Sequence, residues 1–322
     1  MALLEPCNAE SMLNHWACLP AVRSYSVVIH IAQNDHVGRA ISWLLFGVAG
    51  GLALDLCAKQ ILQDYSLQEF VFVRSGIAVI VFLALAPRLF GGIRRLQTSR
   101  WRWHALRTFL AVGVMFGFFY GLSRMPLVNA LTLGFTAPLM MTALSVPFLG
   151  EHVGWRRWMA VTVGFSGVLI MLRPGSGEIS FASIAILIAA FCYACQAISA
   201  RYLAPTESTL SLSLYVVIGP MFVSVLLLDN DSWLTPDVPG WLLLTGAGLS
   251  SVIAWVGLIN GYRGAPTALL APLEYTALIG GAIAGYLIWD EVPDRWVVIG
   301  AMTIIVSGLY VVFRELKVST EA

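Results

Sequence analysis

Ionisable side chains that could do chemistry are rare in this chain of 322 residues, of which only 11% are Asp, Glu, Lys or Arg. The most isolated is Glu274, which lies inside a long apolar segment and follows Pro272. Proline removes a backbone donor and leaves a carbonyl free to line a cavity. An acid in hydrocarbon is costly, so Glu274 is a candidate for substrate binding or proton coupling. The alternative is a packing role between helices.

A second charged group, Asp55, Lys59, Glu69 and Arg74, lies near the ends of the first two apolar segments. Asp55 and Lys59 are four residues apart, a spacing that favours an ion pair on one helical face. Arg74 is well inside its segment, where it could neutralise Asp55 or attract an anionic part of a substrate. A structural ion pair that fixes helix packing is the other interpretation.

Aromatic and amide side chains form a third group. Flat heteroaromatic ligands stack on aromatic faces, and Trp255 and Tyr275 are favoured because Trp is scarce at such depth and Tyr275 adjoins Glu274. Ordinary helix packing is the alternative for all of them. The candidate residues for substrate binding or coupling are Glu274, Tyr275, Trp255, Gln196, Tyr193, Arg74 and Asn260.

Catalytic and cofactor motifs are absent from the sequence. No histidine has metal-ligand spacing to another ligand in the apolar segments, and no phosphate-binding Gly-Lys motif occurs. Cys192 and Cys195 fall in the middle of an apolar segment and are predicted to be small packing residues. We therefore expect no cofactor, no metal and no enzymatic activity. A net charge of +1 without runs of like charge excludes a nucleic-acid binder.

The elements that must position these residues are membrane helices. Apolar residues make up 58% of the chain, and the mean hydropathy is +0.80. A helix needs about 20 apolar residues to cross a bilayer. The sequence therefore predicts an all-α membrane protein with ten transmembrane helices, at 41–61, 70–88, 104–122, 127–148, 155–172, 179–201, 209–228, 240–262, 266–288 and 295–313. Kinks are expected at Pro138 and Pro220.

Basic residues predict the orientation, because cytoplasmic loops hold an excess of Lys and Arg. With the amino terminus inside, thirteen basic residues lie inside and four outside, the latter being Lys59, Arg124, Arg173 and Arg295. Both termini are therefore expected in the cytoplasm. Residues 1–38 are predicted to form a disordered cytoplasmic tail, and residues 315–322 a short second one; a start codon assigned too far upstream would give the same leading pattern.

An internal repeat divides the remainder into two five-helix units, 39–173 and 174–314. A shift of 140 residues matches Gly121 with Gly261, Pro126 with Pro266, Thr136 with Thr276, Ala137 with Ala277 and Glu151 with Glu291. Because five is odd, the second unit must enter the membrane upside down. Inverted repeats of this kind let secondary transporters open a shared central site to either face in turn. At the same shift Glu274 faces Gly134, so the acid occurs in one half only.

These residues resemble the drug/metabolite transporter superfamily over about 39–315. The resemblance rests on Pro126, Thr136, Ala137, Pro138, Gly150, Glu151, Arg156, Arg157, Gly164, Gly167 and Pro174, and on Pro266, Pro272, Glu274, Tyr275, Thr276, Glu291, Val292, Pro293, Asp294, Arg295 and Trp296. It implies a ten-helix carrier of the bacterial inner membrane with both ends in the cytoplasm. Around Glu274 and Trp296 the chain is similar to riboflavin transporters, and less closely to exporters of amino acids or metal-chelating metabolites.

The predicted function is secondary-active transport of a small organic metabolite by alternating access, with riboflavin uptake as the leading hypothesis. Export of amino acids, metal-chelating or other polar metabolites is the first alternative. A membrane scaffold or lipid-handling enzyme is the alternative from another class. The expected partners are a small-molecule substrate and the lipid bilayer; the sequence leaves open whether protons drive transport and whether the chain forms a homo-oligomer.

Overall fold

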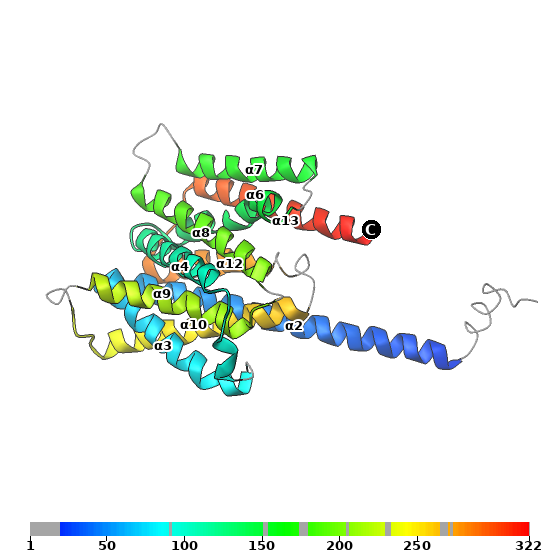
Figure 1. Ribbon diagram of the computed structural model, residues 1–322. Helices are drawn as coiled ribbons and strands as arrows, with labels where there is room; N and C mark the ends of the chain where they lie inside the picture. Colours follow the sequence, from blue (N-terminus) through cyan, green and yellow to red (C-terminus); the bar gives the residue numbers. More distant parts are fainter. Residues whose placement is uncertain are drawn as a thin grey trace, which may run out of the picture.

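The computed structural model describes residues 20–89, 92–150, 154–173, 180–203, 206–228, 233–264, 270 and 273–321. Within these ranges the chain is helical and contains no strand. The elements are α2 (Pro20–Ile61), α3 (Leu67–Leu89), the short 3-10 helix η1 (Ile93–Leu96), α4 (Trp101–Leu122), α5 (Leu127–Gly134), α6 (Ala137–Leu149), α7 (Trp155–Leu172), α8 (Phe181–Leu203), α9 (Thr209–Leu227), α10 (Val238–Gly264), α12 (Thr276–Trp289) and α13 (Arg295–Glu321). They lie side by side in one bundle (Figure 1).

Among the described residues, seven helical stretches are long and apolar enough to cross a membrane. They are Val37–Ile61, Leu67–Arg88, Trp101–Leu122, Leu127–Phe148, Phe181–Ala200, Leu210–Leu227 and Val238–Gly261. They correspond to seven of the ten predicted segments, which confirms a multi-pass membrane protein. The other three predicted segments contain α7, α12 and α13. Here the apolar stretches of α12 and α13 are shorter, and α7 carries Arg156 and Arg157 in its first turn.

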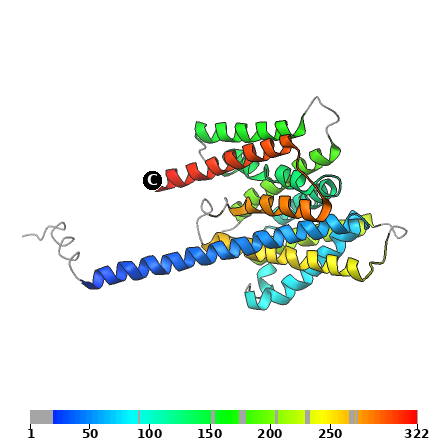
Figure 2. The same cartoon turned by 180° about the vertical axis from the view of Figure 1, so that it is seen from behind.

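Helix α2 begins well before the first predicted crossing. It runs without a break from Pro20 to Ile61, and its first half projects from the bundle (Figures 1 and 2). The predicted disordered tail 1–38 therefore includes helical backbone from residue 20 onwards, while residues 1–19 lie outside the described residues. At the other end, α13 continues through the predicted tail as far as Glu321.

The fourth predicted segment is interrupted near its middle. Helix α5 ends at Gly134 and α6 begins at Ala137, with Pro138 at the start of the new helix. Proline has no backbone amide hydrogen. It is tolerated in the first turn of a helix because amides there have no hydrogen-bond partner within the helix. The predicted irregularity at Pro138 is confirmed, whereas α9 continues without interruption through Pro220.

Small residues let the helices approach closely. An added Cβ at Gly47 of α2 would lie 2.7 Å from the Leu258 amide of α10, and one at Gly117 of α4 would lie 2.7 Å from the Ala185 carbonyl of α8. Gly51, one turn further along α2, has only an ordinary contact, with Ala254 of α10.

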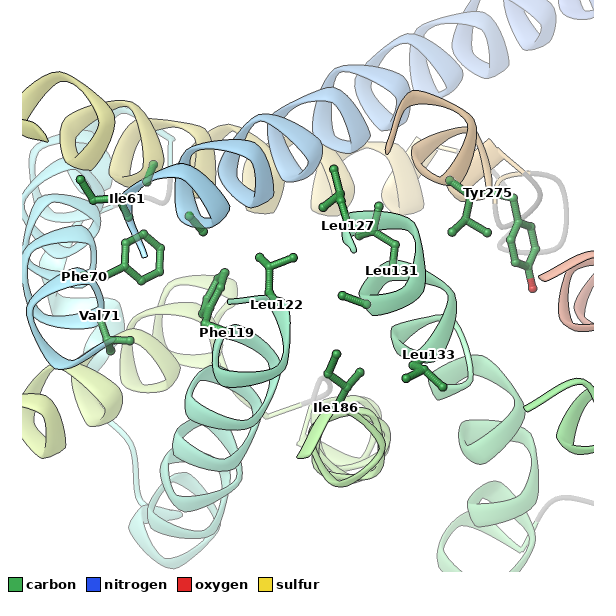
Figure 3. Packing of buried hydrophobic residues seen from close by; sticks show 14 of the residues in the cluster. Ile61, Phe70, Val71, Phe119, Leu122, Leu127, Leu131, Leu133, Ile186 and Tyr275 are labelled. Carbon is green, nitrogen blue, oxygen red and sulfur yellow. The ribbon is translucent and has the colours of Figure 1, made fainter. Parts of the chain in front are cut away.

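The largest buried cluster links most of the helices. Phe70, Phe119, Leu122, Leu127 and Ile186 lie in it (Figure 3). Many other large apolar side chains are exposed on the outside of the bundle, Phe109 to 74% and Ile80 to 68%. Such a surface is expected where lipid is the surrounding solvent.

The bundle has two recognisable ends. At one, which we call the Lys59 end, Lys59 pairs with Glu291, and Tyr65 hydrogen-bonds to Asp237. At the other, which we call the Trp101 end, Thr98 donates to Glu207. Trp103 and Tyr202 also pack there, with ring centroids 5.0 Å apart.

Candidate functional site

The candidate site is built around two helix interruptions that meet inside the bundle. Phe135 lies between α5 and α6, and Tyr275 lies just before α12. Their ring centroids are 5.2 Å apart, with a 34° angle between planes. Tyr275 is 8% exposed, and its hydroxyl points towards α13 (Figure 3). A methyl group added at Gly308 of α13 would overlap that hydroxyl.

Matching hydroxyl groups cap the two interruptions. Thr136 Oγ1 donates to the Leu133 carbonyl at 2.6 Å, and Thr276 Oγ1 donates to the Leu273 carbonyl at 2.6 Å. Each bond spans three residues and gives a carbonyl next to the interruption a side-chain donor; the Leu133 carbonyl also accepts from the Thr136 amide at 3.1 Å. The same local structure therefore surrounds Phe135 and Tyr275.

Glu274 is half-buried next to this ring pair. It interacts electrostatically with Tyr275 and with Tyr193 of α8. Tyr193 is 37% exposed. The structure thus brings together three of the predicted site residues from two elements, and it offers an acid, two phenol groups and the face of Phe135 to one neighbourhood.

Arg74 and Asp55 form a second polar site deeper towards the Lys59 end. The Arg74 side chain is 1% exposed, its Nη1 lies 2.9 Å from Met115 Sδ, and its guanidinium lies 5.8 Å from the centre of the Phe119 ring. Its Nε is buried without a hydrogen-bond partner. Asp55 interacts with it electrostatically, but none of the ion pairs between described residues joins the two. A guanidinium in this state has donor capacity left for an anionic or carbonyl group.

The predicted Asp55–Lys59 pair does not form. Lys59 instead pairs with Glu291 and donates to the Met125 carbonyl at 3.1 Å. Glu291 also accepts from the Leu127 amide at 2.8 Å. The carboxylate therefore caps the first turn of α5, where an anion is favoured. Lys59 therefore has two partners, a carboxylate and a backbone carbonyl, where Asp55 on its own helix would supply only one.

Three other predicted site residues lie apart from the Glu274 neighbourhood. Gln196 is 4% exposed and donates to the Arg107 carbonyl at 3.3 Å. Asn260 donates to the Val256 carbonyl of its own helix at 2.8 Å. Trp255 packs against a separate cluster that contains Phe82. These contacts are of the kind that packing residues make, and a part of the three in substrate binding stays a prediction.

Two polar networks were missed by the sequence analysis. Arg107, 3% exposed, donates from Nη1 to the Gln196 carbonyl at 2.6 Å and to Ser199 Oγ at 3.1 Å, and from Nη2 to the Leu212 carbonyl at 3.1 Å. It therefore joins α4 to α8 and α9. Its place inside an apolar segment was a signal that could have identified it.

The second network surrounds Glu207 at the Trp101 end. Thr98 Oγ1 donates to its Oε1 at 2.6 Å, and His104 Nε2 lies 3.3 Å from its Oε2. Burial alone would raise the pKa of Glu207, but contacts with Thr98, His104 and Ser211 outweigh burial and hold that pKa below its ordinary 4.5. Within the described part of the chain, no three His, Cys, Asp or Glu side chains gather in a way that could hold a metal ion.

Comparisons with known proteins agree on the class of protein. Residues 39–173 match the EamA-like transporter family. The chain is 31% identical over 280 residues to an S-adenosylmethionine uptake transporter of Rickettsia bellii, covering 86% of this chain and 94% of that one. It is 30% identical over 249 residues to a riboflavin transporter of Vibrio cholerae, covering 77% and 83%. A pseudopaline exporter of Pseudomonas aeruginosa is 25% identical over 245 residues, covering 74% and 84%.

A solved crystal structure supports the fold. It superposes with a TM-score of 0.61 over 84% of this chain and 96% of that one, at 20% identity. The resemblance to the drug/metabolite transporter superfamily is confirmed by the family match and by the relatives, which are transporters and not enzymes. The apolar helical bundle, the polar groups inside it and these relatives lead to one conclusion: the chain belongs to the EamA-like transporter family.

Proposed function

We propose that the chain is a secondary-active carrier that works by alternating access between two inverted five-helix halves, 39–173 and 174–314. The helix packing supports this division. If α2, α3 and α4 correspond to α8, α9 and α10, the pairs α2–α10, α3–α10 and α2–α12 should recur as α8–α4, α9–α4 and α8–α6. All six pairs are in contact. A bundle in which the same packing occurs twice can exchange two nearly equal arrangements.

The orientation follows from the basic residues. We propose a bacterial inner-membrane location with the Trp101 end in the cytoplasm, where Arg100, Arg102, Arg156 and Arg157 lie. Both termini then lie in the cytoplasm, and the Lys59 end faces outwards.

The substrate we propose is a heteroaromatic metabolite that also carries charge, and S-adenosylmethionine fits best. The observation that carries this choice is the pair of polar sites: Glu274 beside the Phe135–Tyr275 rings, and buried Arg74 with an unpartnered Nε. An adenine ring can stack on the aromatic side chains. The positively charged sulfonium and amino groups suit the acids, and the carboxylate suits Arg74.

Riboflavin uptake is the second candidate. Its ring system would use the same aromatic faces, and the similarity to the Vibrio cholerae transporter favours it. Riboflavin is neutral, however, and has no anionic group that could pair with Arg74. Protons are the proposed coupling ion in both cases, with Glu274 as the group that takes up the proton.

Transport into proteoliposomes tests the proposal. Purified protein is reconstituted and supplied with labelled S-adenosylmethionine or riboflavin, with and without an inward proton gradient. We expect saturable uptake of S-adenosylmethionine and its loss in Glu274→Gln, while the matched lipid-facing variant Tyr310→Phe behaves as the wild type. Uptake of riboflavin alone would select the second candidate. Efflux from preloaded vesicles without uptake would favour the exporter hypothesis.

A further inference from the structure

Two buried carboxylates link helices that are far apart in the sequence, one at each end of the bundle. Glu69, 2% exposed, stands in the first turn of α3 at the Lys59 end. Glu207, with a side chain 4% exposed, precedes α9 at the Trp101 end. Neither belongs to the candidate substrate site.

Glu69 uses its two oxygens for different purposes. Its Oε2 accepts from the Ser66 amide at 2.9 Å and from Ser66 Oγ at 2.8 Å, while the Glu69 amide donates back to Ser66 Oγ at 3.2 Å. This is a capping box that starts α3. Its Oε1 accepts from the Leu234 amide at 2.5 Å. One oxygen therefore completes its own helix, and the other holds the chain that leads into α10.

Glu207 also contacts both its own helix and another element. Its Oε2 accepts from Ser211 Oγ of α9 at 3.3 Å and lies 3.3 Å from His104 Nε2 of α4. Its Oε1 accepts from Thr98 Oγ1 at 2.6 Å, in the chain that leads into α4. The Glu69 link joins α3 to the residues that precede α10, and the Glu207 link joins α9 to the residues that precede α4.

The two links lie at corresponding helix starts under the proposed repeat, with Glu69 three residues after the capping Ser66 and Glu207 one residue before the capping Ser208. Glu69 and Glu207 are 138 positions apart, close to the 140 of the sequence repeat, and the packing pairs α3–α10 and α9–α4 are counterparts as well. Each link holds its helix pair at one end only. The α3–α10 pair can therefore separate more easily at the Trp101 end, and the α9–α4 pair more easily at the Lys59 end.

We propose that Glu69 and Glu207 are matched positioning residues for transport, and that each keeps one face of the carrier closed between its two helices. This inference rests on the alternating-access function proposed above. Loss of Glu69 loosens α3 from α10 at the Lys59 end, where the Tyr65–Asp237 bond remains, and favours exposure of that face. Loss of Glu207 loosens α9 from α4 at the Trp101 end, where the Arg107–Leu212 and Thr108–Tyr215 bonds remain, and favours exposure of the opposite face. If Glu69 and Glu207 served stability alone, their loss would not favour exposure of opposite faces.

Thiol accessibility from the two faces tests the proposal. Cys57 lies near the Lys59 end of α2, with its Sγ 3.5 Å from the position that a Cβ on Gly246 of α10 would occupy. Ser213→Cys gives a matching reporter near the start of α9. Each reporter is placed alone in a chain whose other cysteines are serine, and its rate of reaction with a membrane-impermeant maleimide is measured in right-side-out and inside-out vesicles.

We expect Glu69→Ala to raise the labelling rate of Cys57, and Glu207→Ala to raise that of Ser213→Cys, each by roughly fivefold or more because a hydrogen bond to a charged group is lost. Thr98→Val, which removes one of the two contacts from Glu207 to the α4 side and leaves His104 in place, should act in the same direction as Glu207→Ala but more weakly. Ser66→Ala and Ser211→Ala remove partners within the same helix end and should leave the balance between the faces unchanged.

The proposal would be overturned if each substitution changed the labelling rates of both reporters equally, or changed neither rate. If Glu69→Ala does not fold, Glu69→Gln, which keeps one acceptor oxygen for Leu234, supplies a milder shift in the same direction. Failure of the substrate proposal is separate: wild-type vesicles would take up no S-adenosylmethionine, while the opposed labelling shifts would persist.

Discussion

Phe135 and Tyr275 stand 140 positions apart in the sequence, and their rings pack against one another with centroids 5.2 Å apart. The separation equals the 140-residue shift of the repeat predicted from the sequence, so under the proposed division the contact joins corresponding points of the two halves. Each follows a helical segment that ends in the middle of the bundle and precedes a threonine with the same side-chain bond. A contact between equivalent residues is expected on an axis that relates two repeats.

Packing of Tyr275 against α13 predicts a strong effect of a small substitution. Gly308→Ala should displace the tyrosine hydroxyl, because the added methyl group would overlap it, and overpacking of this kind is destabilising by about 1–3 kcal/mol. We expect reduced uptake and a lower unfolding temperature in detergent. Gly38→Ala, at a position with nothing within 4 Å, is the control. Wild-type uptake by Gly308→Ala would show that the placement of Tyr275 is irrelevant to transport.

The partner of Lys59 can be identified by double-mutant cycles. Lys59→Met combined with Glu291→Gln should give a coupling energy of about 1 kcal/mol or more, because these residues form one buried network with the first turn of α5. Lys59→Met combined with Asp55→Asn should give a value near zero. The measurement is the free energy of unfolding of the four proteins in each cycle. Coupling to Asp55 instead would contradict the observed pairing.

The pKa of Glu207 predicts how stability depends on pH. Because contacts in the folded protein hold this pKa below 4.5, the ionised group stabilises the fold fully above about pH 4.5, and the contribution disappears as the pH falls through the lowered pKa. The difference in unfolding temperature between wild type and Glu207→Gln should therefore be constant near neutral pH and shrink in acid. Thr98→Val should weaken this dependence. A difference that grows in acid would exclude the assigned direction.

Two buried arginines should behave differently when each is replaced by lysine. Arg107 donates to three acceptors on α8 and α9, so Arg107→Lys should lower stability by roughly 1–3 kcal/mol and leave the KM of the folded fraction unchanged. Arg74 has an unpartnered Nε, and Arg74→Lys should raise KM for a charged substrate by roughly tenfold. Uptake kinetics and thermal unfolding of both variants separate the two roles. A raised KM for Arg107→Lys would reverse the assignment.

The sequence was most informative where the signal was local. Continuous apolar runs located seven helices to within a few residues, since hydrophobicity alone determines where a helix can cross lipid. Pro138 likewise indicated the break between α5 and α6. Glu274 was chosen as an acid inside an apolar run and Tyr275 because it adjoins Glu274, and the structure shows Glu274 interacting with both Tyr275 and Tyr193.

Contacts between distant segments were not predictable in this way. The i,i+4 rule assigned Lys59 to Asp55, but its partner Glu291 lies 232 positions away. Gln196 was predicted to bind substrate. Only the folded bundle shows that its side chain donates to the Arg107 carbonyl. Trp255 and Tyr275 share a depth in their segments, yet they pack in different clusters. A single sequence carries no direct record of which helices become neighbours.

The sidedness of two single cysteines tests the inverted halves most directly. Gly154→Cys, at the start of α7, and Val292→Cys, after α12, both occupy exposed positions, and Val292 is 75% exposed. A membrane-impermeant maleimide is added to intact cells, which expose the outer face, and to inverted vesicles, which expose the cytoplasmic face. We predict that Gly154→Cys is labelled only in the inverted vesicles and Val292→Cys only in the intact cells. Labelling of both from the same face would contradict two inverted halves and the alternating-access carrier built on them.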